Sequence, residues 1–496
     1  MLRWAAAYDE RKASGGGRQL GVATELILGM TGILVGILVG FVDWVLAQRG
    51  DAAMDTLEIR FPKDKDGLTS PSPEQVNRWL RYAGRRVTKF FDLDIPNAAP
   101  ADEEVELPPG LGVPARIKLI LSQRRLRLPP PPAVRYGALT ELELFATRFG
   151  EEASGEGRTA LGDFVSSCCP SLRKLSVIYC RGLPQLVLRA EALQELHLSG
   201  AWDLSTLDVQ APDLRVLRVE NCFYDPTEEL DDIGKKKLAR IKAPRLEEIA
   251  MRSYHRRRPV LDVVHGLSTV RRVNGINLDV HGKCCRKTTG VGLWLLENCR
   301  GVEHINVWLQ HQLAAGVNED ELVDLTSEGA APFAGVRSMV VIANLADDPR
   351  LVASTSSLLR RCPRLKSLEI RSTHFPTTFT DNPVCFCDDS DKWRFDGNIA
   401  LESLEEVKFI DFIGAAPEMH LVGLLFESSN STKRISLIMP PQKKKHRRVV
   451  FKEAERVCHE LMNIPRADMG RWNFWKKKFI WTRNLVEKPV KRSSCS

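Results

Sequence analysis

The apolar residues of this chain recur in a fixed spacing, apolar-x-x-apolar-x-apolar, along most of its length. Leu193, Leu196 and Leu198 form one clear copy, and polar or charged residues lie between them. Ten copies occupy the middle of the chain and start at Leu139, Leu172, Leu193, Leu214, Leu246, Val273, Val302, Val336, Leu365 and Leu404. Because alternate residues of a strand point to opposite faces, each copy predicts a short strand with one buried face. A further copy starts at Met54.

The segments between the copies differ in length, and this difference predicts what they form. Successive copies start 21 to 39 residues apart. The shortest steps leave room for a strand and a loop, whereas the longer steps leave room for a helix. Residues 161–172, 291–302 and 355–365 each contain a short apolar helical run, then a cysteine, then the next strand. One such unit cannot bury its own apolar face, so neighbouring units must stack.

Stacked strand units at this spacing predict an α/β leucine-rich-repeat solenoid, whose regular repeats run about 20–29 residues. We expect a right-handed solenoid with parallel strands on its concave face and helices or loops on its convex face. The alternative is an ordinary parallel sheet of βαβ units, which shares the alternation of strands and helices. Ten matches to one template favour the solenoid.

The residue between the last two apolar positions of each copy should point away from the core, onto the concave face. This position gives the candidate partner-binding residues. They are Ser176, His197, Arg218, Ala250, Asn306, Val340, Glu369 and Lys408. Their charges and sizes are mixed, so the sequence predicts a protein ligand without naming its class. We expect a few central side chains to supply most of the affinity.

The overall composition is that of a globular protein, with 43% hydrophobic and 27% charged residues. Twelve cysteines in 496 residues do not form a disulfide scaffold. Cys169, Cys299 and Cys362 each stand three residues before a strand copy, which predicts a repeated buried position. Free cysteines indicate a reducing compartment, so we expect the cytoplasm, the nucleus or both.

The net charge of +8 is concentrated near the C-terminus, where residues 433–496 hold 18 Lys and Arg against five Asp and Glu. The run Lys443–Lys445 with Arg447 and Arg448 is typical of a nuclear-import signal or an anionic-surface patch. Aromatic residues from Trp472 to Trp481 alternate as on a half-buried strand. This alternation favours a structural strand over nucleic-acid binding.

Four segments together resemble plant F-box/LRR-repeat proteins of the grass type. They are GFVDWVLAQRGDAAMDTLEIRF (40–61), SPEQVNRWLRYAGRRVTKFFDLDIP (72–96), LRLPPPPAVRYGALTELEL (126–144) and CPSLRKLSVIYCRGL (169–183). The stretch from LESLEEVKFIDFIG (401–414) to GRWNFWKKKFIWT (470–482) resembles their C-terminal FBD-type region. The resemblance implies a protein that holds a substrate on its repeats and docks, through an F-box, on the Skp adaptor of a cullin ubiquitin ligase.

The resemblance divides the chain into four parts. Residues 40–138 form an N-terminal LRR-like region with Pro-rich connections, 139–414 the repeat array, and 415–496 the FBD-like region with its basic tail. Residues 1–39 form an atypical leader, without the Leu-Pro-Asp-like opening of an F-box. The chain therefore looks like a truncated or alternatively spliced member of the family.

The leader contains an apolar segment that allows a second interpretation. Residues 26–42 carry no charge and reach the lower length limit of a membrane-spanning helix. Arg11, Lys12 and Arg18 precede this segment, as in a signal anchor. The alternative function is therefore a membrane-anchored LRR ligand-binding protein without ligase coupling, inserted through residues 26–46. A buried or disordered leader explains the same segment.

No motif of catalysis, metal binding or cofactor binding is found in the sequence. It lacks HExxH, a nucleophile elbow and a phosphate loop. We therefore predict a protein without enzymatic activity, catalytic residues, metal ligands or cofactor. The rival hypothesis is an enzyme that uses the acidic loop containing Cys385 and Cys387, although no pair of histidines accompanies these cysteines.

Overall fold

A computed structural model describes most of the chain and divides it into two compact units. Unit 1 comprises Met1–Ile249 and Ser253–Thr269, and unit 2 comprises Ala250–Arg252 and Val270–Ser496. The described residues are 25–29, 35–61, 70–95, 104–109, 114–130, 136–150, 160–223, 237–252, 260–263, 267–281, 287–289, 291–311, 323–324, 332–346, 350–373, 399–440, 456–457, 459–475 and 478–484.

Unit 1 is built on a ladder of parallel strands that pair in chain order. The strands are β1 (Glu25–Gly29), β2 (Met54–Arg60), β3 (Val87–Asp94), β5 (Arg116–Ile120), β7 (Glu141–Phe145), β8 (Lys174–Ile178), β10 (Glu195–Ser199) and β12 (Val216–Glu220). Two residues of each repeat strand point into the core, such as Leu196 and Leu198 in β10, both fully buried. The predicted strands are thus confirmed here, and the intervening residues lie on the opposite side, which we call the open face.

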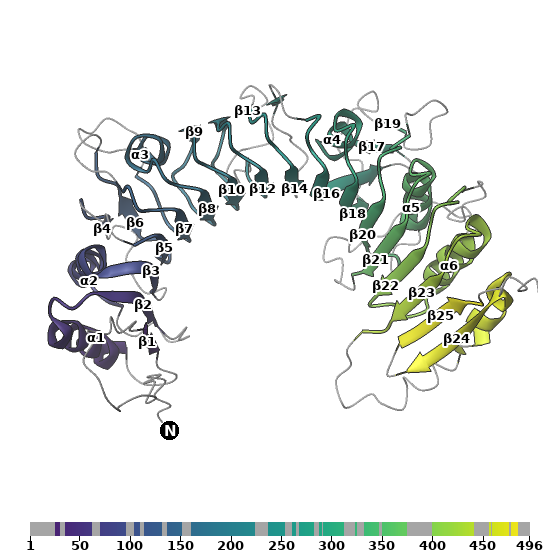
Figure 1. The fold of residues 1–496 in the computed structure, drawn as a ribbon, viewed down its shortest axis with the longest axis horizontal. Helices are drawn as coiled ribbons and strands as arrows, with labels where there is room; N and C mark the ends of the chain where they lie inside the picture. Colours follow the sequence, from purple (N-terminus) through teal and green to yellow (C-terminus); the bar gives the residue numbers. More distant parts are fainter. Residues whose placement is uncertain are drawn as a thin grey trace, which may run out of the picture. The chain divides into compact units, whose positions relative to one another are not determined.

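The other side of this ladder carries an outer layer (Figure 1). Helices α1 (Val35–Arg49), α2 (Pro73–Arg86) and α3 (Leu161–Cys168) lie there, and β4 (Glu104–Glu106) pairs with β6 (Arg125–Arg127). Next to α3 begins a second parallel sheet of β9 (Gln185–Arg189), β11 (Thr206–Gln210), β13 (Leu238–Lys242) and β15 (Val260–Val263). We expected helices or loops on this side, and that expectation was wrong for these repeats.

The second sheet follows from the short repeats. A step of 21 residues holds one strand of the ladder, one strand of the second sheet and the turns between them, so no helix fits. Leu186 and Leu188 in β9 and Leu207 and Val209 in β11 alternate with exposed or half-buried residues and are fully buried. These residues cover the core from its outer side and face the buried leucines of the ladder of parallel strands.

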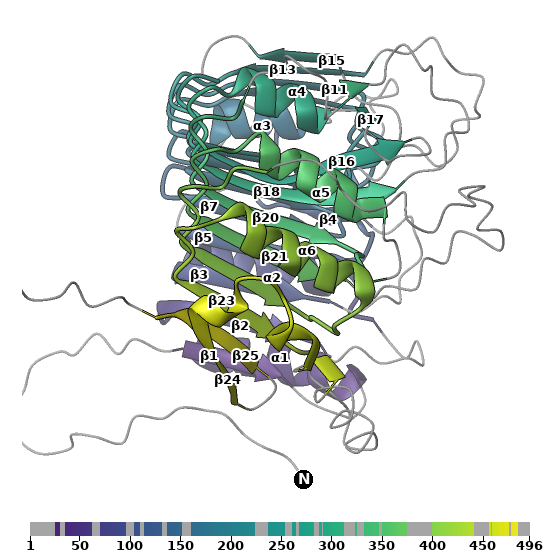
Figure 2. The same ribbon diagram turned by 90° about the vertical axis from the view of Figure 1, so that its right-hand side faces the viewer.

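Unit 2 repeats the same plan with helices in the outer layer. Its parallel strands, in order of pairing, are β16 (Arg272–His281), β18 (His304–His311), β20 (Ser338–Ala343), β21 (Ser367–Ser372), β22 (Glu406–Ile410) and β23 (Arg434–Ile438). Figure 2 shows α4 (Val291–Asn298), α5 (Arg350–Arg360) and α6 (Ala416–Ser428) stacked on one face of this sheet. The helices that we predicted before three strands are α3, α4 and α5.

Short elements complete unit 2. The strand β17 (Lys287–Thr289) is antiparallel to β16 and to β19 (Val323–Asp324). The hairpin of β24 (Gly470–Trp475) and β25 (Lys478–Arg483) joins β23 in antiparallel orientation, and a 3-10 turn at Ala467–Met469 precedes it. The strand β14 (Glu248–Arg252) lies where the chain passes from one unit to the other. The chain is thus α/β, with a large parallel-strand sheet and few helices, consistent with a repeat solenoid.

A recurring turn leads into the strands and explains the cysteine positions. The carbonyl oxygens of Cys169, Cys299 and Cys362 each accept the N–H of the residue three positions later, at 3.2 Å. All three side chains are buried, as predicted. Burial raises the pKa of the Cys299 and Cys362 thiols to about 12 and also raises that of Cys169. These thiols therefore fill small apolar positions in the core and remain protonated.

The N-terminal apolar segment is divided between two elements. Within residues 26–46, the structure describes the strand β1 and much of the helix α1. Among the described residues, no helix combines the length and the apolar character needed to cross a membrane. Most of residues 1–34 lie outside the described part of the chain, as do Lys443–Lys445, Arg447 and Arg448.

The C-terminal aromatic residues serve the core of unit 2. Trp481 is fully buried, donates from Nε1 to the carbonyl oxygen of Ala467 at 2.9 Å, and meets the ring of Phe426 edge-on at 5.0 Å. Phe479 is also buried, whereas Phe474 is 48% exposed. The strand predicted from the alternation of aromatic residues is confirmed as the hairpin β24–β25.

Glu418 in the first turn of α6 provides a test of this packing. Its buried carboxylate accepts the backbone N–H groups of Ile413, Gly414 and Ala415 at 2.9–3.1 Å. Burial raises its pKa above the ordinary value of 4.5, although these three hydrogen bonds act in the opposite direction. The folded protein therefore binds this proton more tightly than the unfolded chain, so the carboxyl group contributes less stability as the pH rises through its folded-state pKa.

We expect Glu418→Gln to remove this pH dependence, because the amide oxygen still accepts hydrogen bonds but does not titrate. Urea unfolding of both proteins between pH 4 and pH 8 measures the difference in free energy of unfolding. The wild type should lose stability relative to Glu418→Gln as the pH rises, by about 1.4 kcal/mol for each unit by which the pKa is raised. A constant difference across this range would contradict the assignment.

Candidate functional site

The open face of unit 1 carries a row of side chains at one register position. Each of these residues lies between two buried residues of its strand and is paired with its neighbours in the row. The row consists of Glu58, Asp92, Lys118, Glu143, Ser176, His197 and Arg218. Three of the predicted binding residues, Ser176, His197 and Arg218, therefore stand side by side on adjacent strands.

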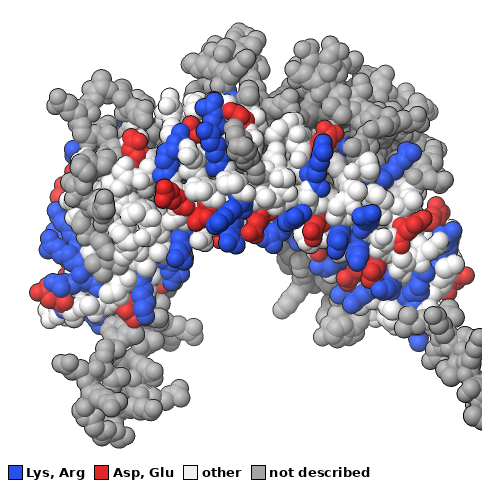
Figure 3. All heavy atoms as spheres, turned by 45° about the horizontal axis from the view of Figure 1, so that its top comes forward, with Lys and Arg blue, Asp and Glu red and all other residues white. Residues whose placement is uncertain are grey.

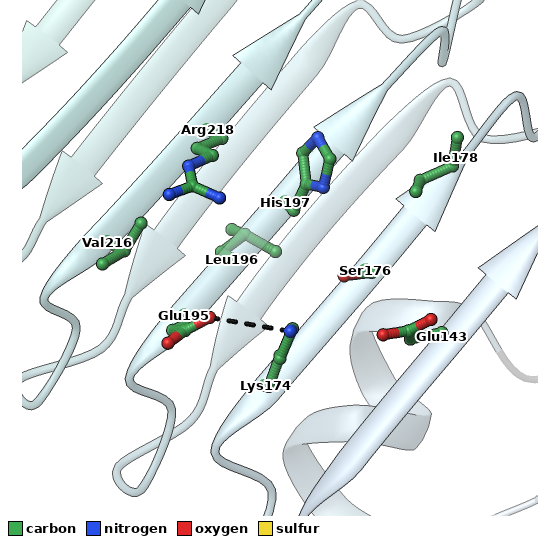
Figure 4. Close-up of a pocket in the computed structure, with 9 residues that line it drawn as sticks. All are labelled: Glu143, Lys174, Ser176, Ile178, Glu195, Leu196, His197, Val216 and Arg218. Carbon is green, nitrogen blue, oxygen red and sulfur yellow. Dashed lines mark ion pairs between the residues drawn. The ribbon is translucent and has the colours of Figure 1, made fainter. Parts of the chain in front are cut away.

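These three residues line a hollow of about 150 Å³ on the open face (Figure 4). Ser176 is buried at its floor, His197 is half-buried, and Arg218 is exposed. Other residues of these strands, and Glu143 from the adjacent strand β7, complete the lining: Glu143, Lys174, Ile178, Glu195, Leu196 and Val216. Apart from Leu196, the added residues lie in the open-face row or two positions from it along a strand. The alternation that locates the leucines could therefore have identified Glu143, Lys174 and Glu195 as well.

His197 has unused hydrogen-bonding capacity in the hollow. Its Nε2 atom is buried and has no hydrogen-bond partner among the described residues. Burial lowers its pKa, and the positive charges of Arg218 and Lys174 act in the same direction, whereas Glu220 and Glu143 oppose them. The imidazole is therefore neutral at physiological pH and can donate or accept a hydrogen bond from a bound partner.

The charged groups around His197 are partly neutralised within the protein. Arg218 donates from Nη2 and Nε to Glu248 Oε1 at 2.8 and 3.1 Å, and Glu248 is buried. Lys174 Nζ lies 3.9 Å from Glu195 Oε2, the pair joined by a dashed line in Figure 4. Basic and acidic side chains are also interspersed over the surface shown in Figure 3. The hollow therefore offers charges of both signs to a ligand.

The other predicted residues lie in unit 2. Asn306, Val340, Glu369 and Lys408 are paired in this order across β18, β20, β21 and β22 and are all half-buried. Ala250, in β14, is buried, so little of its side chain is available to a partner. The structure therefore groups seven of the eight predicted residues into two sets, one on each unit.

On unit 2, the open face is likewise the side of the strands opposite their buried residues. Glu369 lies there and forms hydrogen bonds with two positively charged side chains. Lys408 Nζ donates to Glu369 Oε2 at 2.9 Å, and Arg371 Nε donates to Glu369 Oε1 at 2.6 Å. Burial alone would raise the pKa of Glu369, but these hydrogen bonds outweigh it and lower the pKa. This group is a preformed, charge-paired surface.

The described residues contain no group of three or more His, Cys, Asp or Glu side chains that could hold a metal ion. The loop of the rival enzyme hypothesis, with Cys385 and Cys387, lies outside the described residues. The described side chains of the open faces can form hydrogen bonds, ion pairs and apolar contacts.

Comparison with known proteins gives one partial relationship. An F-box/FBD/LRR-repeat protein of Arabidopsis thaliana is 32% identical to this chain over 124 residues. The alignment covers 24% of this chain and 22% of the Arabidopsis protein, so the chain matches about a fifth of that relative's length. No family model matches the sequence. The similarity supports a distant relationship to F-box/FBD/LRR proteins.

Proposed function

We propose that this chain is a leucine-rich-repeat interaction protein that holds a protein substrate on its open faces for a ubiquitin ligase. The observation that carries the proposal is the hollow at Ser176, His197 and Arg218, where adjacent repeats present different polar groups on one surface. A surface of this kind is suited to recognising a protein, because each repeat can add its own contact. No catalytic role is proposed.

The coupling to a ligase is the second part of the proposal. It rests on the similarity to an F-box/FBD/LRR protein and on the segments that resemble plant F-box/LRR proteins. In this proposal, residues 139–414 form the repeat array, 415–496 an FBD-like region, and the N-terminal part contacts a Skp adaptor and, through it, a cullin. The protein would act in the cytoplasm, the nucleus or both.

Affinity purification of the full chain, followed by mass spectrometry, tests both parts. We expect Skp and cullin subunits together with substrate proteins. The double variant Lys174→Ala/His197→Ala should lose the substrate proteins by about tenfold, since central contacts dominate such interfaces, and should keep Skp. Arg240→Ala, in the second sheet of unit 1, is the control and should change neither the recovery of substrate proteins nor that of Skp.

The two parts of the proposal can fail separately. Recovery of the same substrate proteins with the double variant would refute the assignment of the hollow as the binding surface. Recovery of substrates without Skp or cullin would refute the ligase coupling and leave the interaction function in place.

A further inference from the structure

Three arginines stand next to one another at the rim of unit 1: Arg125 begins the outer strand β6, and Arg148 and Arg181 lie three residues beyond the ends of β7 and β8. Arg125, Arg148 and Arg181 are joined by parallel bridges, Arg125 to Arg148 and Arg148 to Arg181. Backbone hydrogen bonds fix this register: Leu126 N–H donates to the carbonyl oxygen of Arg148 at 2.8 Å, and Arg181 N–H donates to that of Thr147 at 3.0 Å. The three side chains therefore start from equivalent positions about 4.8 Å apart.

Such a stack of like charges is unfavourable for folding. Like charges on directly neighbouring strand positions destabilise a sheet. Within the described parts of the chain, neither Arg148 nor Arg181 has a carboxylate within ion-pair distance. The nearby carboxylate of Asp203 accepts the backbone N–H groups of Gly182 and Leu183 through Oδ2. The rim thus gathers like charges at Arg148 and Arg181, and an anionic ligand would relieve their repulsion.

A group of aromatic rings lies beside Arg181. Tyr179 is 45% exposed, and its ring centroid lies 5.4 Å from that of Phe145 and 6.4 Å from that of Trp202, both edge-on. The guanidinium carbon of Arg181 lies 5.2 Å from the centroid of the Trp202 ring. Exposed tyrosine, tryptophan and arginine side chains are the residues most enriched at the energetic centres of protein interfaces.

The backbone favours display of the Tyr179 ring. Tyr179 has φ +53°, a left-handed conformation that is uncommon for a bulky residue. Ala146 and Asn221, which follow the strands β7 and β12 of the same ladder, have similar φ values with smaller side chains. The next repeat has Gly200 there, and a Cβ on it would lie 2.5 Å from Tyr179 Cδ1. The glycine leaves the space in which the exposed ring lies.

We propose that this arginine–aromatic rim binds an acidic segment of the partner protein that also carries a large apolar side chain. Carboxylates of the segment would contact Arg148 and Arg181, and its apolar side chain would pack on Tyr179 and Trp202. This inference rests on the proposed function, which supplies the protein partner. A nucleic acid fits less well, because Glu143 and Glu195 on the adjoining open face would repel a longer polyanion.

The test uses the full chain and a fluorescein-labelled peptide of aspartates and glutamates with one central phenylalanine. Fluorescence anisotropy should show saturable binding that weakens with salt. Replacing the acids by asparagine and glutamine, or the phenylalanine by alanine, should each weaken binding by about tenfold. A single-stranded oligothymidylate of matched charge should bind less tightly than the acidic peptide.

Two double variants with the same change in charge locate the site. Arg148→Gln/Arg181→Gln should weaken peptide binding by about tenfold. Arg240→Gln/Arg245→Gln, in which both arginines are exposed and paired with Asp262 and Asp213, should change binding less than about twofold. The rim variant should melt no lower than the wild type, because it relieves the repulsion between like charges.

Equal effects of the two double variants would overturn the inference, as would tighter binding of the oligothymidylate. If the rim variant does not fold, the wild type alone provides the test. Equal binding of the acidic peptide and its asparagine and glutamine analogue would then overturn the inference. Loss of peptide binding in the rim variant with recovery of Skp and cullin unchanged would support it. Absence of peptide binding while Lys174→Ala/His197→Ala still abolishes substrate recovery would refute this inference alone and leave the proposed function standing.

Discussion

Gly182→Ala is expected to destabilise unit 1 by more than about 3 kcal/mol, because backbone strain and a backbone clash act together. Gly182 has φ +72°, and a Cβ at this position would overlap the carbonyl oxygen of Phe149. That carbonyl has little freedom to move, since the N–H of Phe149 donates to Arg181 at 2.8 Å and Arg181 donates to Thr147 at 3.0 Å. Urea unfolding monitored by circular dichroism measures the loss.

Gly50→Ala is the matched control for this prediction. Gly50 has φ +53°, but a Cβ there would meet no atom within 4 Å. Only the conformational penalty remains, about 1 kcal/mol. Equal losses of stability in the two variants would show that the Phe149 carbonyl does not pack closely against Gly182.

Leu196→Ala should cost about 3 kcal/mol through the cavity it leaves. Leu196 is fully buried in β10 and is paired in register with Leu175 in β8 and Leu217 in β12. Each repeat contacts mainly its neighbours. The loss should therefore appear as unfolding of unit 1 at a lower urea concentration. Val187→Ala, at a position 39% exposed in β9, should change stability by no more than about 0.5 kcal/mol. Equal losses for both variants would contradict the packing.

The strands could be predicted from sequence because their signal is local. Two apolar residues separated by one polar residue, such as Leu196 and Leu198, define a buried face within a single strand. The same signal was present at Leu186 and Leu188, which form the outer strand β9. This signal did not predict a second sheet, because the outer strands are as short as those of the ladder and the step offers no sign that neighbouring repeats pair there. Pairing between repeats, and not local preference, decides their structure.

The residues of the candidate site could likewise be predicted only in part from the sequence. Ser176, His197 and Arg218 were predictable, since one rule of alternation places them all, and Glu143 obeys the same rule between Leu142 and Leu144. Burial of Ala250 was not predictable, because it depends on what packs over the strand. The stack of Arg125, Arg148 and Arg181 could not have been found from the sequence either. These residues are 23 and 33 positions apart, and only the register of the folded repeats brings them together.

The buried thiols of the recurring turn have a practical consequence. Cys169 lies in unit 1, whereas Cys299 and Cys362 lie in different repeats of unit 2, and none of them can ionise readily in the folded protein. An alkylating reagent can therefore modify each one only after its own repeat has opened. The rates of labelling at these three sites would report the opening free energies of separate parts of the chain. The native sequence thus already carries chemical probes of its local unfolding, without any added label.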